Sequence, residues 1–222
     1  MPVPETAAEP RWRRLPEARP GQILDAAFAV FADRGLAAAR LDDIARRAGL
    51  SKGTIYLYFP SKEELFREVV RTTVITAIER WEALLADEPD PRRALLGWMD
   101  NYWTWLCSPV FPAMYRLMHT ELHRFPDLAA FYATEVIARA HRLVCGIIER
   151  AMAASVLRPM DPLVAARMLS ALFITHANWF HQRAHVASIT NVSDELMLQQ
   201  IRDFFLHAMR PDAPAALPLG RS

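Results

Sequence analysis

The sequence contains little cysteine, glycine or lysine. Of its 222 residues, two are cysteine, seven are glycine and two are lysine. The two cysteines, Cys107 and Cys145, are far apart in apolar helical patterns, so we expect buried thiols in a reducing compartment rather than a disulfide framework. The few glycines and the lack of alternating β-branched runs argue against strands. We therefore predict an all-α fold of about nine helices.

Long apolar runs and catalytic motifs are also missing. No stretch reaches the roughly 18 uncharged apolar residues of a membrane span. The first ten residues carry proline and glutamate instead of the apolar core of a signal peptide. We expect a soluble, cytoplasmic protein with no membrane partner. We find no nucleophile elbow, zinc-protease motif, phosphate loop or dinucleotide fingerprint, so we do not expect an enzyme.

Positive charge is concentrated near the N-terminus, although the net charge of the chain is only +1. From Arg11 to Arg71 there are twelve basic and eight acidic residues, whereas the remainder is slightly acidic. A basic head on a nearly neutral body favours local contact with DNA over non-specific binding of polyanions.

The segment from Arg40 to Leu65 has the pattern of two short helices around a tight turn. Apolar residues between Ile44 and Leu50 recur at helical spacing, and Gly49 suits the left-handed residue that ends a helix. Ser51 is expected to cap the second helix through its hydroxyl. This is the helix-turn-helix arrangement, whose second helix enters the DNA major groove.

The polar residues of this segment are the predicted DNA contacts. The only two lysines flank the second helix, where two ammonium groups suit two phosphates. Its hydroxyls suit phosphates or base edges, and the Thr54 methyl suits thymine. The predicted contacts are Arg40, Ser51, Lys52, Gly53, Thr54, Tyr56, Tyr58 and Lys62. The alternative is a structural helical hairpin with a solvated polar face.

This segment resembles the helix-turn-helix of the TetR family of transcriptional regulators. The similarity covers about residues 20–70. It begins at Gln22 to Gly35 and continues through Asp43-Ile44-Ala45, Ala48-Gly49-Leu50-Ser51, Gly53-Thr54-Ile55-Tyr56, Tyr58-Phe59 and Lys62-Glu63-Glu64-Leu65. Arg40 departs from the pattern, because the family usually has Ser or Thr there as a helix cap. Arginine cannot accept a hydrogen bond from helix N–H groups, so any cap must come from elsewhere.

Composition shifts divide the chain into four parts. Residues 1–19 read as a disordered segment, either a solubilising tail or a basic arm that contacts DNA. Residues 20–70 form the predicted DNA-binding domain, residues 71–210 a ligand-binding and dimerisation domain, and residues 211–222 a frayed tail. A long fourth helix from Ser61 to about Ala86 connects the two domains. Further helices are predicted at 91–107, 111–124, 126–154, 161–186 and 193–209.

The resemblance implies a ligand cavity in the C-terminal half, where aromatic and methionine residues are dense. Most of these residues are expected to form the core, and six are predicted to line the cavity: Trp103, Tyr115, Met118, His119, His176 and Trp179. The ligand would be a small hydrophobic or aromatic molecule. No cofactor is expected, and no metal, because the histidine pairs at i, i+4 lack completing ligands apart from Glu121 beside the first pair.

Broad apolar stripes on the last two long helices predict a homodimer, as in TetR-like proteins. The predicted interface residues are Leu169, Leu172, Leu198, Ile201 and Phe205. Two recognition helices, one turn of DNA apart, would read a palindromic operator. A ligand that shifts the fourth helix would release that operator, with repression as the default. The alternative function is a helical small-molecule carrier without specific DNA binding.

Overall fold

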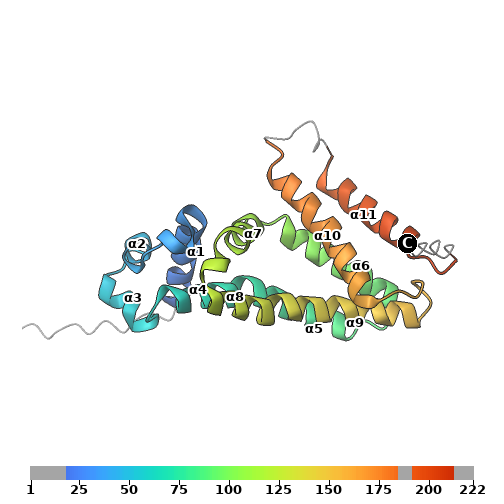
Figure 1. The fold of residues 1–222 in the computed structure, drawn as a ribbon, viewed down its shortest axis with the longest axis horizontal. Coiled ribbons are helices and arrows are strands. Elements are labelled where there is room, and N and C mark those ends of the chain that lie inside the picture. Colours follow the sequence, from blue (N-terminus) through green and yellow to red (C-terminus); the bar gives the residue numbers. More distant parts are fainter. Residues whose placement is uncertain (1–18, 185–191, 213–222) are drawn as a thin grey trace, which may run out of the picture.

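The computed structural model describes residues 19–184 and 192–212, and every element in that part of the chain is a helix (Figure 1). The predicted arm, residues 1–19, lies outside the described residues except for its last residue, and so does the predicted tail beyond residue 212. No helix in the described ranges has both the length and the apolar content of a membrane span.

The helices follow the predicted order. They are α1 (Arg19–Ala38), α2 (Leu41–Arg47), α3 (Lys52–Tyr58), α4 (Lys62–Val70), η1 (Arg71–Ile75), α5 (Thr76–Ala86), α6 (Pro91–Leu106), α7 (Val110–Thr120), η2 (Leu122–Arg124), α8 (Pro126–Tyr132), η3 (Ala133–Ala138), α9 (Arg139–Ala153), α10 (Pro162–His181) and α11 (Asp194–Ala208). The π-helical η1 joins α4 to α5, and η3 joins α8 to α9. With α4–η1–α5 and α8–η3–α9 each counted as one, the described residues form nine helices, α1 with a kink at Gly35, and the short 3-10 turn η2, which confirms the predicted all-α fold.

The N-terminal head consists of α1, α2 and α3, and its helix ends have local causes. Gly35 leaves the helical conformation with φ +77°, and Gly49 ends α2 with φ +65°. The Ser51 hydroxyl caps α3 by accepting a hydrogen bond from the Thr54 amide at 3.2 Å. Arg40 precedes α2 without a side-chain cap, as its chemistry predicts.

One continuous helix, α4–η1–α5, connects the head to the body (Figure 1). It begins at the predicted cap, because the Ser61 hydroxyl accepts from the Glu64 amide at 3.1 Å. In its π-helical part the Thr73 hydroxyl donates to the Val69 carbonyl at 2.6 Å, an alternative partner that accompanies the widened turn. The helix runs beside α8–η3–α9, and α6, α7, α10 and α11 complete the body.

Candidate DNA-binding surface and ligand cavity

The outer face of α3 is exposed on the head. Ile55 is fully buried and anchors the helix, whereas Lys52, Gly53 and Tyr56 point outward. Leu57 is 75% exposed on the same face and was not among the predicted contacts. An apolar side chain with so much exposed surface on a recognition helix suits contact with a thymine methyl. Its position four residues, about one helical turn, after Gly53 could have identified it.

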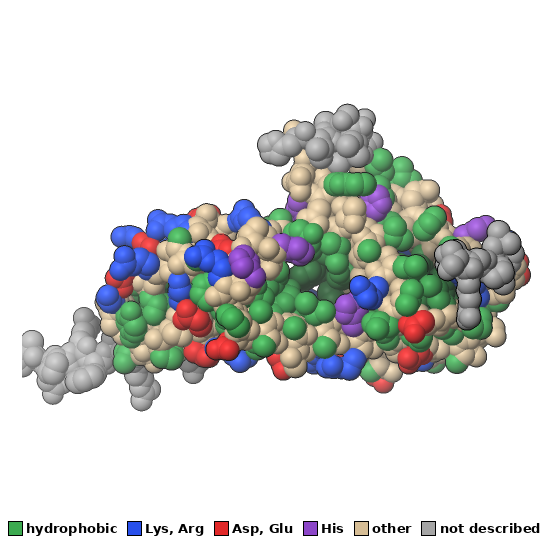
Figure 2. Space-filling model, in the orientation of Figure 1, with side chains coloured by type: hydrophobic (Ala, Val, Ile, Leu, Met, Phe, Trp, Pro, Cys, Tyr) green, Lys and Arg blue, Asp and Glu red, His purple; other side chains and the backbone are tan. Residues whose placement is uncertain are grey.

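Ion pairs and hydrogen bonds organise this face. The Lys52 ammonium donates to the Asp42 carboxylate of α2 at 3.0 Å, and this hydrogen bond raises the pKa of Lys52. The hydroxyls of Ser51 and Thr54 lie 2.8 Å apart, so both belong to the cap of α3. Basic side chains gather over the head in Figure 2, which agrees with the charge distribution of the sequence.

The structure corrects the predicted role of Lys62. Its ammonium donates to the backbone carbonyls of Leu36 and Ala37, each at 2.9 Å, and of Ala39 at 3.3 Å. An ammonium group has three donors, and all three are used here to satisfy carbonyls at the end of α1. The predicted phosphate contact from Lys62 is therefore wrong in this conformation, and Lys62 is a helix cap.

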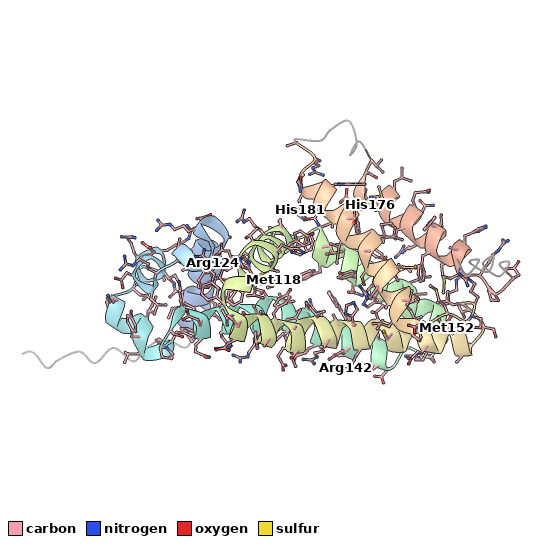
Figure 3. The ribbon with its side chains drawn as sticks, in the orientation of Figure 1. Met118, Arg124, Arg142, Met152, His176 and His181 are labelled. Carbon is pink, nitrogen blue, oxygen red and sulfur yellow. The ribbon has the colours of Figure 1, made fainter. Side chains whose placement is uncertain are left out.

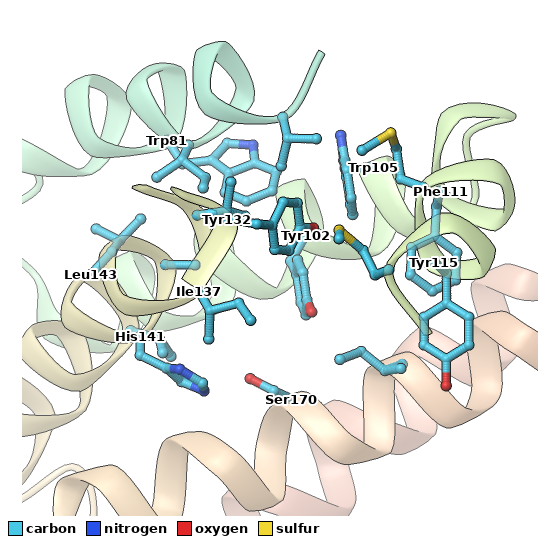
Figure 4. Close-up of a pocket in the computed structure, with 18 of the residues that line it drawn as sticks. Trp81, Tyr102, Trp105, Phe111, Tyr115, Tyr132, Ile137, His141, Leu143 and Ser170 are labelled. Atoms are coloured by element: carbon cyan, nitrogen blue, oxygen red, sulfur yellow. The ribbon is translucent and has the colours of Figure 1, made fainter. Parts of the chain in front are cut away.

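A cavity of about 310 Å³ lies in the body between α5, α6, α7, α9 and α10 (Figure 4). Figure 2 shows the surface hollowed there, with hydrophobic side chains around the opening. Aromatic residues form much of its wall: Trp81, Trp98, Tyr102, Trp105, Phe111, Tyr115 and Tyr132. Trp98, Tyr102 and Trp105 recur on one face of α6 at helical spacing, which directs all three to the same side.

The polar groups of the cavity are uncharged or are imidazoles. Ser170 on α10 and His141 on α9 point into it (Figure 4), and His119 stacks on Tyr115 with ring centroids 3.9 Å apart. Burial raises the pKa of Tyr132 to about 12 and raises that of Tyr102 further, so both phenols stay protonated at neutral pH. Among the described residues that line the cavity there is no Asp, Glu, Lys or Arg.

Two family models match consecutive parts of the chain. Residues 23–69 match bacterial regulatory proteins of the tetR family, and residues 93–208, just over half of the chain, match the C-terminal domain of AefR-like transcriptional repressors. The chain belongs to the TetR family. Its first matched part corresponds to the N-terminal domain of these bacterial regulatory proteins, and its second to the C-terminal domain of AefR-like repressors.

Individual TetR-family relatives differ in what they do. The chain is 38% identical over 97 residues to the transcriptional activator FasR of Mycolicibacterium smegmatis. This aligned region covers 43% of this chain and 44% of FasR. The chain thus spans less than half the length of the first relatives it matches. A regulator from Saccharomonospora viridis in complex with choline superposes with a TM-score of 0.71, 27% identity, and coverage of 87% of this chain and 97% of that one. The flavonoid-responsive regulator FrrA superposes with a TM-score of 0.61, 28% identity, and coverage of 89% and 100%.

Three of the six predicted ligand residues of this TetR-family chain line the cavity, and three do not. Tyr115, Met118 and His119 of α7 line it. Trp103, His176 and Trp179 border a separate small hollow next to α11, and Figure 3 shows His176 on the side of α10 away from Met118. Each residue of a helix is rotated by about 100° from the one before it, so Trp103 and Trp105, two positions apart, lie on nearly opposite faces of α6.

The predicted dimer residues are corrected in part. Leu169, Ile201 and Phe205 are at most 5% exposed in the single chain, so they belong to its own core. Leu172 and Leu198 are partly buried against that core. The large apolar residues that the last two helices leave exposed are Leu163, Val164, Met168, Trp179, Leu196 and Phe204.

Proposed function

We propose that this protein is a dimeric repressor that binds a palindromic operator and releases it when a small hydrophobic or aromatic ligand occupies the cavity. The observation that carries this proposal is that two helices which line the cavity also contact the DNA-binding head. The continuous helix α4–η1–α5 and the helix α7 both line the cavity, and both contact α1 of the head. A molecule in the cavity therefore adjoins the elements that hold the recognition helix in place.

The proposed DNA contacts are centred on α3. Tyr56 and Leu57 offer an amphipathic ring and an apolar tip to base edges, while Lys52 and Arg40 are exposed cations near its start. Ser51, Gly53, Thr54 and Tyr58 remain proposed contacts through their backbone or hydroxyl groups. Lys62 is no longer included, because its donors are occupied.

The cavity favours a ligand without an anionic group. A carboxylate or phosphate would find no cationic Lys or Arg partner among the described lining residues, and burying an unpaired charge is costly. Aromatic walls suit flat apolar molecules, and aromatic faces also attract quaternary ammonium groups. The flavonoid response of FrrA and the choline complex of the Saccharomonospora viridis regulator fit these two chemistries. Ser170, His141 and the phenols would donate or accept the orienting hydrogen bonds.

Dimerisation is proposed through the exposed apolar face of α10 and α11. Met168, Trp179 and Phe204 are 57%, 41% and 65% exposed on these helices. Such a face is stabilised when a second copy covers it, and a two-fold dimer presents two α3 helices to a palindrome. The site of action would be the cytoplasm, where a bacterial chromosome lies.

Operator selection tests this function. Duplexes enriched by the full-length protein from a random library are titrated at several salt concentrations against scrambled duplexes. Flavonoids and choline are then added to look for release. We expect a palindromic selected site, selective binding with a steep salt dependence, and loss of binding in Tyr56→Ala. Equal weak binding to selected and scrambled DNA would refute the proposal and favour a small-molecule carrier.

A further inference from the structure

The C-terminal end of α7 holds the head through one carboxylate. The Glu121 side chain, directly after α7, accepts a hydrogen bond from the Ala37 backbone amide of α1 at 2.7 Å, across 84 residues of sequence. This bond is partly buried and joins an ionised acceptor to a backbone donor, which makes it stronger than a neutral pair.

Gly35 makes room for this carboxylate. Its φ of +77° and ψ of 166° break the helical pattern of α1, and a Cβ atom added there would overlap the Glu121 carboxylate. With the helix interrupted at Gly35, Glu121 supplies an acceptor for the Ala37 amide just beyond the break. The glycine and the glutamate therefore form one fitted contact between head and body.

Other contacts at the same place strengthen the junction. Arg116 of α7 donates to the carbonyl of Ala32, and the Lys62 ammonium caps the last carbonyls of α1. The Lys62 ammonium also lies 5.8 Å from the centre of the Phe125 ring, just after η2. The end of α1 is thus held from α7 on one side and from α4 on the other.

The helix that carries Glu121 is also a wall of the cavity. Met114, Tyr115, Met118 and His119 line the cavity, and His119 precedes Glu121 by only two residues. A helix is stiff over a few residues, since its rise is about 1.5 Å per residue and each turn is hydrogen-bonded. A displacement of α7 by an occupant of the cavity would therefore move the Glu121 carboxylate relative to Gly35 and Ala37.

We propose that Glu121 is the positioning residue that couples cavity occupancy to the orientation of the DNA-binding head. This inference rests on the proposed function and names the side chain through which α7 acts on α1. Coupling requires that an occupant favour one arrangement of head and body over the other. The contact between Glu121, Gly35 and Ala37 is the element whose geometry would differ between the two arrangements.

The test fills the cavity with a side chain, so it needs no identified ligand. Ser170 points into the cavity from α10, remote from α7 in sequence, and Ser170→Trp places an indole there (Figure 4). Ala140→Phe on α9 is the second filling variant in case the first does not fold. The dissociation constant of full-length protein for the selected operator duplex is measured with and without filling, in the wild-type, Glu121→Ala and Glu121→Gln backgrounds. Glu149→Ala, at an exposed position on α9, is the matched control.

We expect filling to weaken operator binding by about tenfold or more in the wild type and the Glu149→Ala control, within the usual range of allosteric coupling. In the Glu121→Ala background, filling should raise the dissociation constant less than about twofold. In the Glu121→Gln background, where an acceptor for the Ala37 amide remains, filling should weaken binding almost as much as in the wild type. If filling weakens operator binding equally with and without Glu121, the coupling role of Glu121 is overturned while the proposed function stands. No effect of either filling variant in the wild type overturns both the coupling and the release mechanism.

Discussion

The two lysines allow one matched comparison of DNA contact and helix capping. Lys52 lies exposed at the start of α3, whereas Lys62 caps the end of α1 with three hydrogen bonds to carbonyl oxygens. The substitutions Lys52→Met and Lys62→Met remove the same ammonium group from positions ten residues apart. We expect opposite effects on folding and on DNA binding.

The magnitude for Lys62 follows from its partners. A hydrogen bond to a charged group contributes about 1.5–3 kcal/mol, but the three bonds share one partly exposed group and do not add fully. We expect Lys62→Met to lower the free energy of unfolding by about 2–3 kcal/mol, or roughly 5–10 °C in melting temperature for a chain of this size. Lys52→Met should leave the free energy of unfolding close to that of the wild type, because an exposed ion pair such as Lys52–Asp42 contributes little.

The effect on DNA binding runs the other way. Each phosphate contact adds about 0.9 to the slope of log affinity against log salt, so loss of one contact per head lowers the slope of a dimer by about 1.8. Lys52→Met should show this loss, and Lys62→Met should keep the wild-type slope at temperatures where it is folded. The assays are urea unfolding at fixed protein concentration and operator titrations at several salt concentrations.

The reasoning would be refuted by the reverse pattern. If Lys62→Met is as stable as the wild type and loses salt dependence, then its ammonium leaves the α1 carbonyls to contact phosphate. If Lys52→Met unfolds as easily as Lys62→Met, the ion pair with Asp42 is structural.

Three further outcomes are expected. Phe204→Glu places a charge on the exposed apolar face and should give a monomer by light scattering. Phe205→Ala should leave that face unchanged but lower the free energy of unfolding by about 3–5 kcal/mol, since Phe205 is buried. A dimeric Phe204→Glu would contradict the assigned face. Gly35→Ala should destabilise the fold by at least about 1–3 kcal/mol, since its backbone region is open almost only to glycine, and Glu121→Ala should recover the part due to overlap. Burial lowers the pKa of His176 below its ordinary 6.5, so the unfolded chain binds the proton more readily and stability falls as pH drops below about 6.5. His176→Gln should lose less stability than the wild type between about pH 7.5 and pH 5, as urea unfolding at each pH would show.

The helix boundaries could be predicted because they depend on neighbours in sequence. Ser51 caps α3, and Asp90 accepts from the Arg92 amide at 2.9 Å to begin α6. Gly49 ends α2 and Gly35 interrupts α1 through their own left-handed backbone conformations. Each of these features involves residues no more than a few positions apart, so residue type and spacing were sufficient.

The candidate site was predicted only in outline, because its details depend on which helix faces meet. Trp103 and Trp105 are both aromatic residues of α6, yet only Trp105 lines the cavity. Met168 is exposed and Leu169 is buried, although both are large apolar residues of α10. The residues of these pairs are rotated from each other by about 200° and 100° around their helices. A pattern of apolar residues wider than one helix face does not specify which of the two is buried.

The sequence by itself determined the family, the all-helical fold and the order and starts of the helices, since these follow from local periodicity, caps and a contiguous motif. Two predicted ends were several residues too late, because α7 ends at Thr120 and α10 at His181. The tertiary structure decided that Lys62 caps α1, that Ser170 and His141 face one cavity, and that Glu121 contacts Gly35 and Ala37. These contacts join side chains and backbone groups far apart in the chain. Only the packing of complete helices against one another brings them together.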